Sequence, residues 1–205
     1  MKHDMSRELF EYWTKLRGSR KAPMRLELDP SAIASLLSNT FVLERLDPVT
    51  YNYRLAGTRI CSYHTKELRS TSFIDQWGGK DKETLESLLY TITEDAAGAV
   101  IGYVAYARDD VKVPFEALLL PLARGNGSFD RVIGITAPMA DEYWVGVLPI
   151  QSAKIKSVRL LWPVGLPKYN KETSNTQFPA KFGESQLDAA TEARPNFKVI
   201  KGGLS

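Results

Sequence analysis

Two long segments of the chain carry apolar residues at helical spacing. Residues 5–17 place Leu9, Trp13 and Leu16 along one face, with charged residues between them. Residues 80–97 repeat this arrangement over several turns, with charges on the opposite face. The spacing predicts an amphipathic helix near the N-terminus and a longer one in the middle of the chain.

Short helices are predicted at two further places. Asp29 and Pro30 suit a helix start, because Asp accepts hydrogen bonds from free amides and Pro fits the first helical position. Gly57 interrupts an extended segment, and Thr58 follows as a cap for a short helix that carries Ile60. Both segments are too short to form a core alone.

The remaining apolar pattern is that of β-strands. In residues 51–56 Tyr51, Tyr53 and Leu55 alternate with polar residues, so we expect one aromatic face to point inward. Residues 113–123 are apolar almost throughout, which indicates a strand buried on both faces. The predicted strands are residues 41–46, 51–56, 99–107, 113–123 and 131–138, with a possible further strand at 157–162.

The composition changes after Trp162. Residues 163–205 are rich in Pro, Gly, Asn, Thr and Lys and poor in aliphatic residues, so we expect a weakly structured extension. The chain is thus divided into an N-terminal helix and linker (1–28), one folded domain (29–162) and this extension (163–205).

Composition and charge narrow the classes of partner. The chain has 205 residues, 43% of them hydrophobic and 25% charged, with a net charge of +3. This charge is too small to indicate nucleic acid as a partner. No apolar run approaches the ~20 residues that span a bilayer, so no membrane insertion is expected. The polar start and the single cysteine, Cys61, favour a cytoplasmic location.

Four short motifs, in this order, resemble the PAS superfamily. They read YRLAGTRI at residues 53–60, KEL at 66–68, FIDQW at 73–77 and FEALLLPLA at 115–123. With the Trp helix before them, they are similar to those of short stand-alone proteobacterial PAS proteins. His64-Thr65 and Ser70 stand where that group commonly has glycine.

The resemblance implies an α+β fold. Its centre would be a five-stranded antiparallel sheet of order 2-1-5-4-3, flanked by helices and preceded by the N-terminal helix. It also implies signal detection or protein interaction, often as a dimer, and it does not imply an enzyme. A fold alone does not fix a function, so the site has to be argued from residues.

The residues offer little support for a cofactor or a metal. PAS haem sensors ligate iron through a His on the long helix, and residues 80–97 contain none. Cys61 lies in RICSYH, which lacks the asparagine-cysteine-arginine context of flavin photosensors, so we interpret it as a small buried residue. His64 is interpreted as structural, and His and Cys are too few for a metal centre. We therefore expect no cofactor and no metal.

Aromatic and aliphatic residues from separate segments are the candidates for an internal pocket. Tyr and Trp combine contact area with a polar tip, as small-molecule sites require. The alternative is a filled core without space for a ligand. Glu116, within an apolar strand, either points outward or needs a partner. The predicted lining residues are Tyr53, Leu55, Ile60, Phe73, Trp77, Leu89, Tyr103 and Leu119.

The expected function is a non-catalytic sensory or regulatory module. It would bind a small ligand or a partner protein and signal in trans to another protein. The alternatives are a ligand-free adaptor and an enzyme hidden in the same scaffold. We expect a homodimer formed through Leu9, Trp13 and Leu16, although the same helix could instead dock on its own sheet.

Overall fold

The computed structural model describes residues 1–108, 111–125 and 127–163. Three α-helices were predicted in the right places: α1 (Asp4–Arg17), α2 (Thr58–His64) and α3 (Gly79–Asp95). The predicted helix after Asp29 is a 3₁₀ helix, η2 (Pro30–Asn39), and the Asp29 side chain accepts from the amide of Ser31 as expected of a cap. Two further 3₁₀ turns are η1 (Arg25–Glu27) and η3 (Ile74–Gln76). The expected C-terminal extension, from residue 164 onward, lies outside the described residues.

One antiparallel sheet forms the centre of the described part, with the order β2-β1-β5-β4-β3-β6. The predicted α+β fold and the predicted order of its first five strands are confirmed. The further strand predicted at residues 157–162 is present as β6, and it begins earlier than predicted, at Ser152. It extends the sheet by pairing with β3. The strands are β1 (Thr40–Arg45), β2 (Tyr51–Ala56), β3 (Gly98–Tyr106), β4 (Lys112–Leu122), β5 (Arg131–Pro138) and β6 (Ser152–Leu161).

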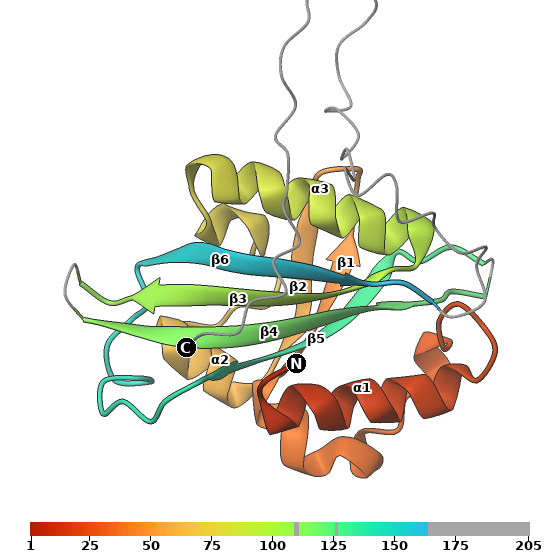
Figure 1. Cartoon of the computed structure of the whole chain (residues 1–205), viewed down its shortest axis with the longest axis horizontal. Helices are drawn as coiled ribbons and strands as arrows, with labels where there is room; N and C mark the ends of the chain where they lie inside the picture. Colours follow the sequence, from red (N-terminus) through yellow and green to blue (C-terminus); the bar gives the residue numbers. More distant parts are fainter. Residues whose placement is uncertain (109–110, 126, 164–205) are drawn as a thin grey trace, which may run out of the picture.

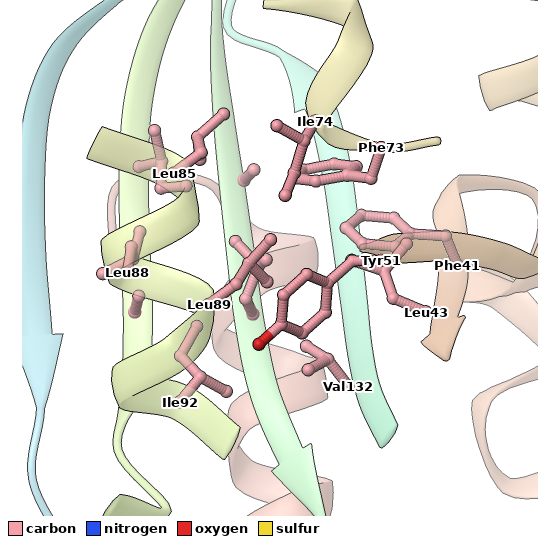
Figure 2. Packing of buried hydrophobic residues seen from close by; sticks show 14 of the residues in the cluster. Phe41, Leu43, Tyr51, Phe73, Ile74, Leu85, Leu88, Leu89, Ile92 and Val132 are labelled. Atoms are coloured by element: carbon pink, nitrogen blue, oxygen red, sulfur yellow. The ribbon is translucent and has the colours of Figure 1, made fainter. Parts of the chain in front are cut away.

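Helix α3 covers one face of this sheet, and Figure 1 shows it on the opposite side from α1. Figure 2 shows its apolar face directed at the side chains of β1, β2 and β5. Leu85, Leu88, Leu89 and Ile92 are fully buried in this cluster. Burial of each such side chain stabilises the fold by about 1.5–3 kcal/mol, so this layer fixes the helix on the sheet.

Helix α1 covers the other face. Leu9 and Trp13 are buried in a second cluster with Leu118 and Leu120 of β4, and the Trp13 Nε1 donates to the carbonyl of Pro121 at 2.8 Å. The helix has therefore docked on its own sheet, the alternative noted for it above. Leu9 and Trp13 are not exposed to a second copy in this structure, while Leu16 is half-buried. Dimerisation itself stays a prediction.

A bulge in the first hairpin corrects one predicted residue. Val42 pairs with Leu55, but the next residue, Leu43, pairs with Tyr53, so Arg54 is the extra residue on β2. An extra residue reverses the side on which the following side chain lies. Leu55 is consequently 49% exposed rather than inside, and its predicted place in a pocket is wrong.

Candidate functional site

A cavity of about 520 Å³ lies on the α3 side of the sheet. Its walls come from β1, β2, α2, the segment 71–77 and the sheet strands β3, β4 and β5, and the start of β6 closes one side. The volume falls within the range of roughly 300–1,000 Å³ that is common for small-molecule sites. The cavity lies among the segments from which the candidate lining residues were drawn.

Six aromatic residues, Phe41, Tyr53, Tyr63, Phe73, Trp77 and Tyr103, are among those that line the cavity. Phe41 and Phe73 stack with centroids 5.6 Å apart, and Tyr53 meets both rings edge to face. Trp77 meets Tyr103 edge to face at 5.1 Å. Offset stacks and edge-to-face pairs are the favoured arrangements of such rings, so these contacts stabilise the wall.

The aromatic residues of this wall carry two kinds of polar group, phenol hydroxyls and an indole N–H. The hydroxyl of Tyr103 lies 2.8 Å from Oγ1 of Thr136, and burial raises the pKa of both Tyr53 and Tyr103, so the two phenols stay protonated. The indole of Trp77 differs from them. It is only 8% exposed, and its Nε1 is buried without a hydrogen-bond partner among the described residues. A buried donor without an acceptor costs about 1–3 kcal/mol.

Three further titratable side chains, His64, Lys66 and Asp75, lie at the rim of the cavity. Burial, with the nearby Lys66 ammonium, lowers the pKa of His64 to about 4, so its imidazole is neutral at pH 7. Asp75 pairs with Lys82 at 2.8 Å, and this contact lowers the pKa of the Asp75 carboxyl. Lys66 is exposed.

Two residues of the loop 65–70, at the rim of the cavity, have the positive φ angles that are more common for glycine. Thr65 has φ 50° and Ser70 has φ 65°, both in the left-handed region. These are the places where the resembling proteins commonly have glycine. Non-glycine residues hold this conformation only where the surroundings impose it. Here the Ser70 amide donates to Tyr53 O at 2.7 Å, which ties the loop to β2.

The structure brings together five of the residues predicted for the pocket, namely Tyr53, Ile60, Phe73, Trp77 and Tyr103. Leu89 and Leu119 are fully buried in the adjacent cluster and do not line the cavity. Residues 149–153 line it but were not predicted, because long-range contacts bring them near: β6 pairs with β3 from Ser152 onward, and the Ile150 amide donates to Tyr63 O at 2.8 Å. Tyr63 and Gln76 were missed too, although Gln76 lies within the motif FIDQW and Tyr63 follows the motif YRLAGTRI by three residues.

Glu116 connects the cavity side of the sheet to the N-terminus. Its carboxylate accepts from the amides of Lys2 at 2.7 Å and His3 at 3.0 Å, on the face covered by α1. Its backbone carbonyl accepts from Oγ1 of Thr136, the partner of Tyr103. Glu116 is 6% exposed, so it is a buried carboxylate with partners. Burial acts to raise the pKa of this carboxyl, but the hydrogen bonds outweigh it and hold the pKa below its usual value.

The described residues offer neither a metal-binding cluster nor a membrane-spanning helix. No three His, Cys, Asp or Glu side chains gather there in a way that could hold a metal ion. Among the same residues, no helix has the length and apolar composition that crossing a bilayer requires.

Comparison with known proteins identifies the family. A family described as PAS domain matches residues 1–137, about two thirds of the chain and all of α1 through most of β5. None of the curated proteins compared with the chain matches it.

The similar solved structures have low identity. A light-oxygen-voltage domain studied with a flavin analogue has 14% identity and a TM-score of 0.43, and covers 55% of this chain and 85% of its own. The PAS domain of an HTR-like protein from Haloarcula marismortui has 20% identity and a TM-score of 0.37, over 56% of this chain and 95% of its own. The family match carries the assignment. The chain belongs to the PAS domain family.

Proposed function

We propose that this protein is a sensory module whose cavity binds a small ligand and which signals in trans to another protein. PAS domains in general are sensory and signalling modules, which supports the broad class. The observation that carries the finer proposal is the cavity of about 520 Å³, whose lining includes the rings of Phe41, Tyr53, Phe73, Trp77 and Tyr103. A filled core would leave no such space.

The proposed output lies on the α1 side of the sheet. Tyr103, Thr136 and Glu116 form a hydrogen-bonded path from the cavity wall to the amides of Lys2 and His3. A ligand that displaces the Tyr103 ring would disturb this path and the attachment of α1. A change in α1 is then available to a partner protein, or to a second copy of the chain through its half-buried Leu16.

The wall supports binding rather than catalysis. Tyr53 and Tyr103 are held protonated, His64 is neutral on the rim, and Asp75 is engaged by Lys82. Nucleophilic catalysis needs a nucleophile, a base and an orienting group in mutual contact. We therefore propose a non-enzymatic role. We also propose the cytoplasm as the compartment, because proteins of reducing compartments do not depend on disulfides and this chain has a single cysteine.

Native mass spectrometry of the purified 205-residue protein tests ligand sensing. The expected result is a bound small molecule on the wild type that is absent from Ala153→Phe, whose added ring would occupy the cavity from β6. Ser157→Phe is the matched control, because Ser157 lies on the other face of β6, against Gly102, and should retain the molecule. A wild type that carries no molecule, and whose Tm shifts with none of a set of metabolites, would favour the ligand-free adaptor instead.

A further inference from the structure

The inner wall of the cavity selects for shape. Five rings line it as one connected set: Phe41, Tyr53 and Phe73 contact one another, Trp77 contacts Tyr103, and the centroids of Phe73 and Trp77 lie 6.4 Å apart. An inserted flat ring can add one more stack or edge-to-face contact to this set. A saturated ring of the same size has no quadrupole with which to make these contacts, so the wall favours an aromatic ligand.

The rim selects for charge. Three titratable groups line it, His64, Lys66 and Asp75. Asp75 is already paired with Lys82, and His64 is neutral at pH 7 because its pKa is about 4. Lys66 makes no ion pair with any residue in the described part of the chain. The charge left uncompensated at the opening is therefore positive.

We propose that the cavity takes a flat aromatic ring that carries one anionic group, with the ring against the aromatic wall and the anion at the rim beside Lys66. This rests on the proposed function, since it names the chemical class of the ligand for the same cavity. Asp75 does not repel the anion strongly, because Lys82 lies 2.8 Å from its carboxylate.

Three probes of similar size separate ring from charge in isothermal titration calorimetry. They are 2-naphthoate, its uncharged amide 2-naphthamide, and the saturated acid decahydronaphthalene-2-carboxylate. We expect 2-naphthoate to bind about fivefold more tightly than 2-naphthamide, the effect of one ion pair at a partly exposed site. Decahydronaphthalene-2-carboxylate is expected to bind most weakly, because it lacks the aromatic ring contacts.

Lys66→Gln is expected to abolish the preference for the acid over the amide. Lys80→Gln removes the same charge from an exposed position that does not line the cavity, and should keep the preference. An independent readout is the pKa of His64 by NMR, which an anion beside it should raise from about 4, whereas the amide should not.

The outcomes distinguish this inference from the proposed function. Equal affinity for the acid and the amide, or a preference that survives Lys66→Gln, would overturn the anionic class while ligand binding stands. Failure of all three probes, with a different molecule found by native mass spectrometry, would overturn the aromatic acid and leave the sensor. Failure of all three with no bound molecule would overturn both.

Discussion

The attachment of the N-terminus through Glu116 permits a sharp prediction for Glu116→Gln. The carboxylate accepts from the amides of Lys2 at 2.7 Å and His3 at 3.0 Å. Hydrogen bonds to a charged group contribute about 1.5–3 kcal/mol each. Glutamine keeps one acceptor oxygen and turns an NH₂ donor toward the other amide, so one bond is weakened and one is lost.

The freed amides can move into water, which recovers part of the loss. We therefore expect the free energy of unfolding to fall by about 1–2 kcal/mol and Tm to fall by roughly 3–6 °C. Urea unfolding at pH 7 measures the first quantity, and hydrogen exchange at Lys2 and His3 should accelerate. Glu83→Gln is the control, because Glu83 is exposed on α3, away from the N-terminus.

The effect of Glu116 should depend on pH in a defined direction. Its pKa in the folded protein is below the ordinary value of 4.5. Its contribution is therefore complete above about pH 4.5 and is lost as the pH falls through the lower folded pKa. Wild type and Glu116→Gln should differ at pH 7 and converge in strong acid. Equal stability at pH 7, or a difference that grows on acidification, would refute the assigned contacts.

Three other changes test the packing and the rim. Gly134→Ala should destabilise the protein strongly, since its Cβ would lie 2.2 Å from Cζ of Phe41, whereas Gly125→Ala meets nothing within 4 Å; equal urea midpoints for the two variants would contradict this packing. His64→Gln should reduce the loss of thermal stability between pH 6.5 and about 4, because the folded protein takes up this proton at a lower pH than the unfolded chain; an unchanged slope of Tm against pH would argue against it. Leu9→Ala should lower the free energy of unfolding by about 2–4 kcal/mol in denaturant titrations, and a loss under about 1 kcal/mol would mean that α1 is not docked.

Periodicity predicted the elements well because burial is regular along them. The apolar face of residues 80–97 became the buried face of α3, and the apolar run 113–123 became β4, which lies between β5 and β3 with both faces covered. The order of the strands followed from the motifs instead, since alternation alone does not say which strands are neighbours.

The failures occurred where the period is interrupted. Leu55 fits an alternating pattern, but the bulge at Arg54 reverses the side on which it lies, and the pairing partner that causes the bulge is not visible in one strand. Strand β6 has a similar shift opposite Gly102 and Tyr103, which concealed its start at Ser152. The wall formed by residues 149–153 depends on that strand and could not be predicted without it.

Two hydrogen bonds bear on how the sequence of this protein can evolve. Tyr103 contacts Thr136, and Thr136 donates to the Glu116 carbonyl. A substitution at Tyr103 that alters which molecule is recognised also removes or moves a link to the anchor of α1. If the cavity binds a ligand as proposed, ligand preference and the position of α1 depend on the same residue, so a change in the first also alters the second.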